Sequence, residues 1–293
     1  MHKKSSLNLF DYFNYVFLIL LACITIYPFL YVLTGSFNQG SDYMRGGVYL
    51  FPRVFSLDNY SMIFYDKRLA FGFQNTIART IIGTVAGVIF TALVSYGMSR
   101  KNLPYARQIY WFNLFTLFFS GGLIPYFLLL KSLGLINTFW VYIFPCLYSV
   151  FNMIIFSSFS REIPEEIHES AVVDGANEFT IFWKLYLPLS KPAVATIALW
   201  LGVFHWNSFF DSMIFTTKPE LQTLQLFLVK LIKEASLSQG EAATRVPAQV
   251  ISKVSITTIR FAAIVVGSIP IFMVYPFMQK YLIKGVMLGS VKG

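Results

Sequence analysis

About six long apolar stretches constrain this chain more than any other feature of its sequence. They run over residues 15–36, 73–98, 108–130, 139–160, 192–215 and 260–282. A helix needs ~20 predominantly apolar residues to cross a bilayer, so each stretch is long enough to span one. Apolar residues make up 56% of the 293 residues and charged residues only 13%, which excludes a soluble domain with a solvated surface. The sequence therefore predicts an all-α polytopic membrane protein, with six transmembrane helices in a single domain over residues 1–293.

The first apolar stretch follows Lys3 and Lys4, as the apolar core of a secretory signal would. Its apolar run is much longer than the ~7–15 residues of such a core, so we expect a retained transmembrane helix, kinked at Pro28. Residues 1–14 are expected to form a cytoplasmic segment with a short amphipathic helix on the membrane surface. Basic residues in the short connections near span ends indicate that both termini lie in the cytoplasm.

A polar insert interrupts the apolar pattern between the fourth and fifth stretches. Pro164 suits the first position of a helix, and Glu165 and Glu166 complement the positive end of the helix dipole. Asp174 and Gly175 follow, and Gly175 can take the positive φ that closes a helix. A first helix is therefore expected to begin at Pro164 and to end in a sharp bend.

The second half of the insert carries the marks of another short helix. Asn177 can cap its start. Its aromatic residues fall at i, i+3, i+4 and i+7, and they are Phe179, Phe182, Trp183 and Tyr186. This spacing predicts one aromatic face, on a helix that Pro188 ends. The insert is thus predicted to be a helix, a bend and a second helix within a cytoplasmic loop over residues 161–191.

Motifs of common catalytic and nucleotide-binding sites are absent from the sequence. No Gly-Lys dipeptide occurs, so a Walker A loop is excluded and any energy from ATP must come from a partner. The histidines, His2, His168 and His205, do not form a zinc-protease pattern, and no metal site is predicted. Cys23 and Cys146 lie in predicted spans and are expected to be small buried thiols without a disulfide. We therefore do not expect an enzyme.

Polar side chains within predicted spans are costly in lipid unless they face a cavity or another helix. The fifth stretch contains a cluster of them, namely His205, Trp206, Asn207 and, near its outer end, Asp211. We interpret this cluster as the candidate translocation path, with Asn113 and Asn152 in the third and fourth stretches as weaker candidates. The alternative is that the asparagines bond to neighbouring helices and that Asp211 lies at the headgroup level.

The third stretch is interrupted by Gly121, Gly122 and Pro125. A break of the helix within the membrane either lines a cavity or allows close packing of helices. The sequence leaves these two interpretations open.

Two long loops, residues 37–72 and 216–259, face outward in this arrangement. The first contains tyrosines and phenylalanines that give it apolar material to pack, so an ordered surface is expected. The second contains a predicted amphipathic helix whose apolar face consists of Leu221, Leu224, Leu228, Leu231 and Ile232. A polar tip over residues 236–247 follows and is suited to reach a soluble partner. The second loop also has a net positive charge, which favours an anionic ligand.

The spacing within the insert is that of a known motif. Glu169-Ser170-Ala171 is followed after three residues by Gly175, and after nine more by Leu185-Tyr186-Leu187-Pro188. This pattern resembles the EAA loop of permease subunits of binding-protein-dependent ABC importers, with Ser170 and Leu185 in place of the family's Ala and Ile. The resemblance implies a type I importer permease fold. It also implies that the insert is a coupling helix seated in a groove of an ATPase subunit.

Further segments extend the resemblance over nearly the whole chain. They are residues 73–77, 95–100, 121–125, 133–138, 151–155 and 205–211. They are similar to permeases of carbohydrate importers of the maltose type. Within these, residues 121–125, 133–138, 151–155 and 205–211 resemble a branch that handles oligosaccharides, several members of which take uronate-containing ones such as alginate. The resemblance implies import of an oligosaccharide, acidic and of the alginate type, across the inner membrane of a bacterium.

The resemblance also implies partners and residue roles. The partners are a second permease subunit, two ATPase subunits that bind ATP and Mg²⁺, an external solute-binding protein and the lipid membrane. No cofactor on this chain and no nucleic-acid partner are expected. The coupling residues would be Glu165, Glu166, Glu169, Ala171, Asp174, Gly175, Ala176, Phe179 and Pro188. The outer loop 216–259 would enter the binding protein as a scoop, with contacts from Ser238, Gln239, Gly240 and Arg245.

Three other interpretations stay open. An ABC permease for a different solute would share the insert but should lack the cluster at 205–211. A channel or ion-coupled transporter would work without ATP and would be expected to show inverted repeats, which are not evident in this sequence. A membrane scaffold would move no ligand at all.

Overall fold

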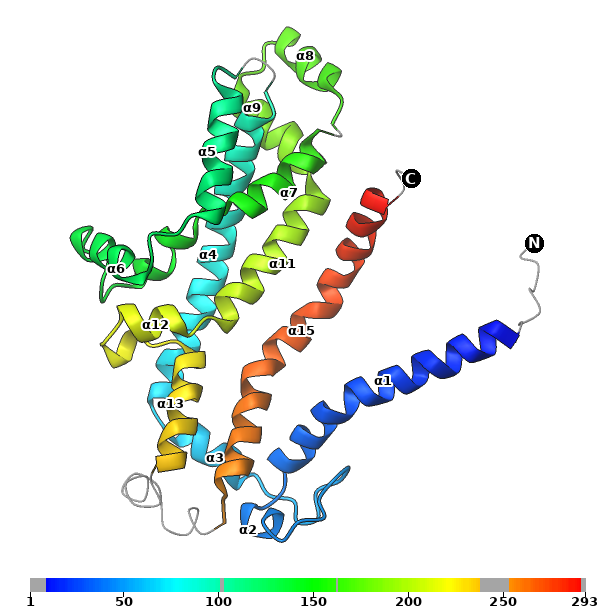
Figure 1. Cartoon of the computed structure of the whole chain (residues 1–293), viewed down its shortest axis with the longest axis vertical. Coiled ribbons are helices and arrows are strands. Elements are labelled where there is room, and N and C mark those ends of the chain that lie inside the picture. Colours follow the sequence, from blue (N-terminus) through cyan, green and yellow to red (C-terminus); the bar gives the residue numbers. More distant parts are fainter. Residues whose placement is uncertain (1–8, 101–102, 162, 238–252, 291–293) are drawn as a thin grey trace. The chain divides into compact units, whose positions relative to one another are not determined.

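The computed structural model describes residues 9–100, 103–161, 163–237 and 253–290, and helices dominate them (Figure 1). Within these ranges, the β structure is limited to one isolated bridge between Asn38 and Phe55. The predicted all-α class is therefore confirmed.

The helices differ widely in length. The α-helices are α1 Leu9–Ser36, α2 Gly40–Tyr43, α3 Asp58–Tyr65, α4 Arg68–Met98, α5 Ala106–Phe118, α6 Leu123–Ser132, α7 Val150–Ser160, α8 Glu165–Val173, α9 Glu178–Ile181, α10 Leu187–Leu189, α11 Lys191–Asn207, α12 Phe210–Phe215, α13 Leu224–Leu237 and α15 Ile256–Ser290. Short 3-10 helices are η1 Phe139–Tyr142, η2 Phe144–Cys146 and η4 Pro219–Leu221, and η3 Phe182–Tyr186 is a π-helix.

Among the described residues, three helices are continuous enough to cross a membrane. They are α1, α4 and the Ile256–Val274 part of α15. Three further candidates are bent pairs: α5 and α6 meet at 114°, η1 and η2 meet α7 at 49°, and the segment Glu178–Leu189 meets α11 at 81°. The predicted six spans are reached only if each bent pair counts as one span.

The first span differs from its prediction. Because no proline or glycine lies between Leu9 and Pro28, α1 runs unbroken from Leu9, and the described part of residues 1–14 does not form a separate helix. Cys23 is exposed, as is most of α1, so the prediction of a buried thiol there is wrong. Cys146 is partly buried. The exposure of α1 follows from how few residues of this chain pack against its length.

The fifth span also ends earlier than predicted. α11 stops at Asn207, where Ser208 takes an extended conformation with φ −70° and ψ 125°. A separate helix, α12, then begins at Phe210. Ser208 thus lies outside both helices, and the polar cluster expected on one helix is divided between two.

Contacts divide the chain into two compact units. One contains residues 1–67 and 228–269, and the other contains residues 68–227 and 270–293. The second unit holds every candidate site residue that the structure describes.

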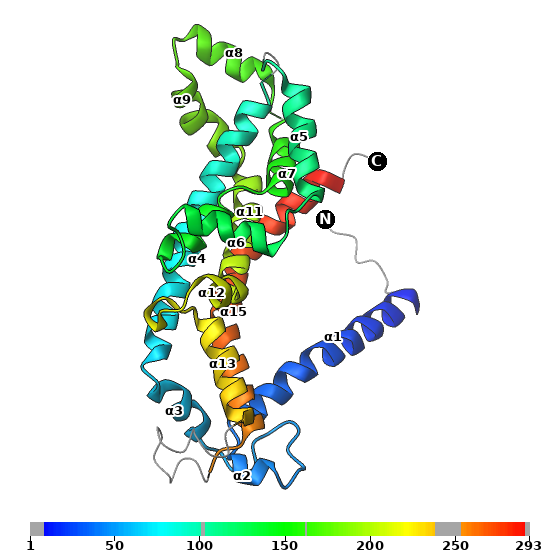
Figure 2. The same ribbon diagram turned by 60° about the vertical axis from the view of Figure 1, so that its left-hand side comes forward.

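In the second unit α4 and α11 lie side by side, α7 packs against α4, and α5 packs against α7 (Figure 2). Their shared apolar core contains Val88, Ala92, Phe156, Ala193, Ile197 and Leu201. Glycine allows α4 and α11 to approach closely, because a Cβ at Gly87 would lie 2.8 Å from Leu201 Cδ1. Between helices in a membrane, close packing of this kind stabilises the contact through van der Waals interactions, because lipid is as apolar as these side chains.

In the first unit, Asn59 ties together segments that are far apart in sequence. This buried side chain donates to the carbonyl oxygens of Ser36 and Asn38, both at 2.9 Å. It accepts a hydrogen bond from Thr258 Oγ1 at 2.7 Å. Phe37 also stacks on Phe55 at 5.6 Å between ring centroids. Residues 37–72 are therefore ordered as predicted, and their position on the outer side stays a prediction.

An ion pair supports the same loop. Arg53 Nε lies 3.0 Å from both carboxylate oxygens of Asp42, and Asn38 Nδ2 donates to Asp42 Oδ2 at 3.1 Å. The hydrogen bond from Arg53 is the largest reason why the pKa of Asp42 lies below its ordinary value. The loop is therefore held by charge as well as by apolar contacts.

The amphipathic helix predicted in the second outer loop is present as α13. Leu224, Leu228 and Leu231 are buried as expected, and Ile232 is partly buried. Leu221 lies instead in η4, because the chain is extended at Gln222 before α13 begins. Most of the polar tip at 236–247 lies outside the described residues.

Candidate functional site

The predicted bend of the insert is present and has a local cause. α8 begins at Glu165, with Pro164 as the residue before it and not as its first residue, and it ends at Val173. Gly175 has a φ of +81°. Its N–H donates to the carbonyl of Val172 at 3.0 Å, and the N–H of Ala176 donates to the carbonyl of Ala171 at 2.9 Å. These two bonds form a Schellman closure, which satisfies the last carbonyls of α8.

The second half of the insert begins as predicted. The side chain of Asn177 accepts a hydrogen bond from the N–H of Thr180 at 2.8 Å and so caps α9. After one turn the chain changes to the π-helix η3, in which the N–H of Leu187 donates to the carbonyl of Phe182. The helical path then continues through Pro188 to Leu189. The prediction that Pro188 ends this helix is therefore wrong, since a proline at the first turn of α10 needs no N–H donor there.

The predicted single aromatic face is also wrong, because it is split in two. Phe182 and Tyr186 are buried, whereas Phe179 is 70% exposed and Trp183 is 37% exposed. In a π-helix each residue turns the chain by a smaller angle than in an α-helix, so α-helical spacing does not hold through η3. One pair of aromatic side chains therefore packs inward, and the other pair faces outward.

The buried pair anchors the insert on the helices of the second unit. Tyr186 packs edge-on against Tyr96 of α4 at 4.8 Å and stacks with Phe156 of α7 at 6.0 Å, between ring centroids. Its hydroxyl is hydrogen bonded to the hydroxyl of Ser160. Ala171 of α8 is also buried in this core. The insert is thus packed rigidly against α4 and α7 and does not hang free.

The opposite side of the insert is exposed and mixed in character, beyond the ends of α5 and α7 (Figure 1). Its exposed members are Glu166, Glu169, Asp174, Gly175, Phe179 and Pro188, and Glu165 and Ala176 are partly buried. Val173, between them, is 85% exposed. Carboxylates around an apolar tip are suited to contact another protein. Of the nine expected coupling residues, all except Ala171 therefore keep some accessible surface.

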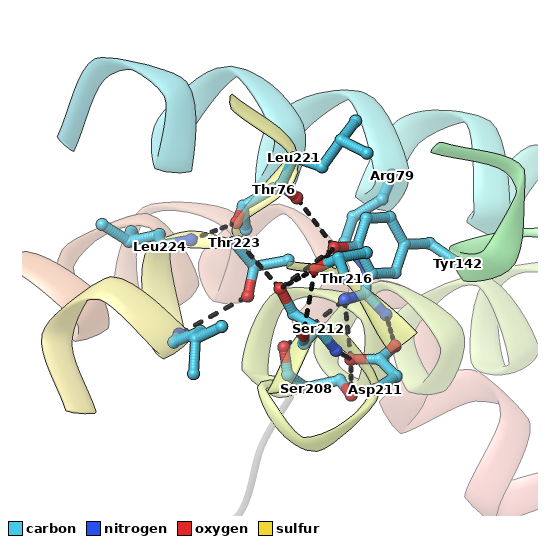
Figure 3. Close-up of polar contacts among 11 residues, drawn as sticks. Thr76, Arg79, Tyr142, Ser208, Asp211, Ser212, Thr216, Leu221, Thr223 and Leu224 are labelled. Atoms are coloured by element: carbon cyan, nitrogen blue, oxygen red, sulfur yellow. Dashed lines mark hydrogen bonds and ion pairs between the residues drawn. The ribbon is translucent and has the colours of Figure 1, made fainter. Parts of the chain in front are cut away.

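A second candidate site is a buried polar cluster around Arg79 and Asp211 (Figure 3). Arg79 of α4 has no exposed surface, and its Nη1 lies 3.1 Å from Asp211 Oδ1, with a second contact from Nη2 to Oδ2. Its guanidinium group lies over the ring of Tyr142, 4.5 Å from the centroid. Ser208 Oγ and the N–H of Ser212 also donate to Asp211, at 2.9 and 2.8 Å. A buried charge is thus neutralised where α12 meets α4.

Hydrogen bonds extend this cluster toward the start of α13 (Figure 3). The Tyr142 hydroxyl contacts Ser212 and Thr216 and donates to the carbonyl of Leu221 at 2.7 Å. Thr76 Oγ1 accepts from the N–H of Leu224 at 2.9 Å. The cluster therefore connects α4, η1, α12 and the first turn of α13 through hydrogen bonds, although Arg79 Nε has no partner among the described residues.

Sequence reasoning missed Arg79. It is the only charged residue between Phe73 and Met98, the bounds of the second predicted span. Since an isolated charge within a span is expensive unless it is paired, a search for such residues would have found it. Its partner Asp211 was predicted as part of the translocation path. In the structure Asp211 is engaged by Arg79.

The three consecutive path residues at the end of α11 differ in their exposure. His205 is fully buried between α11 and α4, and neither ring nitrogen has a hydrogen-bond partner among the described residues. Trp206 is also buried. Asn207 is exposed and donates to the carbonyl of Val203 at 2.9 Å. Of these three residues, Asn207 is thus the exposed one.

The two asparagines on other spans are placed differently. Asn113 is partly exposed on α5, donates to the carbonyl of Ile109 at 2.9 Å and accepts from the Tyr148 hydroxyl. Asn152 is buried in the first turn of α7. Asn113 therefore bonds to a neighbouring segment, which is the alternative to a role in the translocation path.

The predicted break of the third span is present. Gly122 has a φ of +88° and lies between α5 and α6, and Pro125 falls in the first turn of α6. An open hollow of about 570 Å³ is lined here by Gly121, Gly122 and Tyr126, among others. Within the described residues, a Cβ at Gly121 or Gly122 would meet no atom within 4 Å, so neither glycine is needed there for close helix packing.

The four residues predicted to contact a binding protein, Ser238, Gln239, Gly240 and Arg245, lie outside the described residues. Within the described ranges, no group of three or more His, Cys, Asp or Glu residues is arranged to hold a metal ion.

Comparison with known proteins gives consistent matches over nearly the full length. Residues 3–288 match the family described as "Binding-protein-dependent transport system inner membrane component". Protein LplC of Bacillus subtilis (strain 168) is 35% identical over 296 residues, covering 100% of this chain and 98% of the relative. The polygalacturonan/rhamnogalacturonan transport system permease protein YtcP of the same organism is 38% identical over 291 residues, with 98% and 99% covered.

Two solved structures are similar. One is a chain from a crystal structure of a bacterial ABC transporter involved in the import of the acidic polysaccharide alginate. It superposes with a TM-score of 0.85 and 32% identity, covering 93% of this chain and 96% of that chain. The other is from a bacterial alginate ABC transporter in complex with an alginate pentasaccharide-bound periplasmic protein. With a TM-score of 0.59 and 14% identity over 92% and 93% of the two chains, it is informative about the fold alone.

Proposed function

This chain belongs to the family of binding-protein-dependent transport system inner membrane components, and we propose that it carries an acidic oligosaccharide of the alginate type. It is a permease subunit of an ABC importer for sugars or oligosaccharides, embedded in the membrane. It is accordingly a component of a transporter and not an enzyme.

The observation that carries the proposed mechanism is the insert from α8 to α10. One side of it is packed into the core with α4 and α7, and the other side exposes carboxylates around Val173. We propose that this exposed side is seated in a groove of an ATPase subunit, where Glu169 pairs with a basic group. Closure of the ATPase pair then moves the insert as a lever. The spans that the insert joins, α7 and α11, tilt and open the path by alternating access.

The energy for this cycle comes from outside the chain. We propose that two ATPase subunits bind ATP and Mg²⁺ and that no cofactor is held by this chain. A second permease subunit completes the pathway, and an extracytoplasmic solute-binding protein delivers the sugar to loop 216–259. Both termini and the insert then lie on the cytoplasmic side, because an ATPase can reach the insert only there.

The proposed cargo is supported by chemistry and by similarity. The similar structure belongs to an importer of an acidic polysaccharide, and a similar permease is named for polygalacturonan and rhamnogalacturonan. Loop 216–259 has an excess of lysine and arginine over glutamate, which attracts a polyanion. These observations favour a chain of uronates over a neutral oligosaccharide.

We propose that the sugar passes the break between α11 and α12. Residues 205–211 would line the path, and Asn207, which is exposed, would contact the sugar. Asn113 and Asn152 are proposed as secondary contacts from α5 and α7. A polar, discontinuous span is suited to this task because non-helical backbone at membrane depth lines cavities.

The experiment that tests the cargo uses the complex co-purified with its ATPases and second permease, in lipid vesicles with its binding protein. ATP hydrolysis is measured with uronate oligosaccharides and with neutral oligosaccharides of equal length. We expect stimulation by the uronates only. Equal stimulation by neutral sugars would contradict the acidic cargo.

A separate cross-linking experiment tests the docking of the insert. Cysteine is introduced at the exposed tip by Val173→Cys and, as a control, in the first outer loop by Phe51→Cys, after Cys23 and Cys146 have been replaced by serine. We expect Val173→Cys alone to form cross-links to an ATPase subunit. Labelling of this cysteine from outside the cell would contradict the orientation and the mechanism together.

A further inference from the structure

One side chain of the insert reaches α4, a helix to which the insert has no covalent connection. The chain enters the insert from α7 and leaves it into α11. The hydroxyl of Tyr96, close to the end of α4, donates a hydrogen bond to Glu178 Oε2 in α9. Glu178 thus provides a direct polar link between the insert and α4.

The ring of Tyr96 is held firmly in place around this bond. It packs edge-on against Phe182 at 5.6 Å and against Tyr186 at 4.8 Å, between ring centroids. The guanidinium group of Arg100 lies over it, 4.5 Å from the centroid. Only 8% of Tyr96 is exposed. A ring enclosed in this way has little freedom to turn its hydroxyl away from Glu178.

The same carboxylate also contacts the first helix of the insert. His168 Nε2 of α8 lies 3.2 Å from Glu178 Oε1 and 3.4 Å from Oε2. Glu178 therefore lies between α8 and α4, across the bend at Gly175. A displacement of α8 against the rest of the insert would act on this side chain.

A simpler role for Glu178 is available and must be distinguished. A carboxylate in the first turn of a helix is favoured by the helix dipole, here that of α9, and needs no partner. That role does not account for a buried tyrosine hydroxyl and a histidine that converge on the same two oxygens.

We propose that Glu178 is a positioning residue of the transport cycle, which passes the movement of α8 to α4 through the hydroxyl of Tyr96. This inference rests on the proposed function of the insert as the ATPase contact. α4 packs against α11 and carries Arg79, the partner of Asp211. The link therefore connects the ATPase contact with the helix that holds the buried polar cluster.

The test compares variants in the complete complex, reconstituted with its ATPases, second permease and binding protein. Tyr96→Phe removes only the hydroxyl, and Glu178→Ala removes the acceptor. Glu178→Gln keeps an oxygen acceptor and is the conservative variant. Tyr105→Phe is the matched control, because Tyr105 is 74% exposed. The readout is the amount of sugar transported per ATP hydrolysed, with thermal stability measured in parallel.

We expect Tyr96→Phe and Glu178→Ala each to lower sugar transported per ATP at least about fivefold, the lower end of typical coupling between sites. Glu178→Gln should restore most of the ratio, and Tyr105→Phe should leave it unchanged. The double variant should be no worse than either single one, since both remove the same contact.

Four results would count against the inference. An unchanged ratio with a lowered melting temperature would show a merely structural role. Losses that add up in the double variant would show that the two residues act separately. Each variant also carries Val173→Cys, which reports contact with the ATPase. If the cross-link forms and the sugar transported per ATP is unchanged, only this inference is overturned. If the parent complex forms no cross-link, the proposed function is overturned as well.

Discussion

The imidazole of His205 occupies the space in front of Gly83, so that a Cβ at position 83 would lie 2.4 Å from Nε2. The contact joins α4 and α11, whose close packing dominates the second unit. Neither ring nitrogen of His205 has a hydrogen-bond partner in the described part of the chain, and the side chain is fully buried. The close fit at Gly83 therefore depends on the absence of a side chain there and not on a polar bond.

We predict that Gly83→Ala destabilises the protein by about 1–3 kcal/mol, the usual effect of added volume in a packed core. The measurement is the melting temperature of the purified complex in detergent. Gly97→Ala on the same helix is the control, since a Cβ at Gly97 has no atom within 4 Å. It should be neutral or stabilising by up to about 1 kcal/mol, because alanine favours helix. A decrease of equal size in both variants would contradict the steric explanation.

The Arg79 and Asp211 pair should respond differently to loss of each partner. Asp211→Asn leaves Arg79 as an unpaired cation whose side chain has no exposed surface. Arg79→Met leaves an unpaired carboxylate at Asp211, but 17% of that side chain is exposed. Loss of one partner of a buried pair typically costs about 3–5 kcal/mol. We expect Asp211→Asn to lie in this range and Arg79→Met to cost less, measured as thermal stability and as the amount of inserted protein.

The double variant Arg79→Met with Asp211→Asn serves as the control for this pair. It removes both charges and should be more stable than Asp211→Asn alone. If the double variant is the least stable of the three, the two residues do not act as a neutralising pair.

Gly175→Val should abolish sugar-stimulated ATP hydrolysis without preventing membrane insertion. Nothing lies within 4 Å of a Cβ at this position, so the effect comes from the φ of +81°. Left-handed backbone costs about 1–2 kcal/mol for residues with a Cβ and is worst for β-branched ones. Gly175→Asn should retain much of the activity, because asparagine tolerates this conformation. Full stimulation in Gly175→Val would count against the bend as a requirement for coupling.

The ion pair of Asp42 and Arg53 should make the first outer loop sensitive to acid. The pKa of Asp42 is lower in the folded protein than its ordinary value, chiefly because Arg53 donates to its carboxylate. The ionised carboxylate of Asp42 therefore contributes fully to stability above the pKa of an unfolded Asp, about 3.9. This contribution is lost as the pH falls through the lower pKa that Asp42 has in the folded protein. We expect the melting temperature to fall below about pH 4, and Asp42→Asn to reduce this dependence. The same dependence in the variant would assign it to other carboxylates.

Features that depend on neighbouring residues were predictable from the sequence. The closure at Gly175 needs only a residue that takes positive φ, and the cap at Asn177 needs only a side-chain oxygen close to the N–H of Thr180. The break at Gly122 is equally local. The spacing of the insert motif indicated the family for the same reason, because all of its residues lie within a short segment.

Features that depend on distant segments were not predictable in this way. The split of the aromatic face follows from which side of η3 meets Tyr96 and Phe156, two residues on other helices. The end of α11 at Asn207 likewise precedes a helix, α12, that is held to α4 by the Arg79 pair. No periodicity within one segment contains this information.

By itself the sequence determined that the chain is a helical membrane protein with a bent insert, because apolar length, positive φ and helix capping act over a few neighbouring residues. The tertiary structure decided which polar groups meet. Arg79 neutralises Asp211, His205 packs against Gly83, and Glu178 accepts a hydrogen bond from the hydroxyl of Tyr96. The physical reason is that buried charges and hydroxyls need partners at hydrogen-bond distance, and only the packing of helices brings residues so far apart in sequence that close.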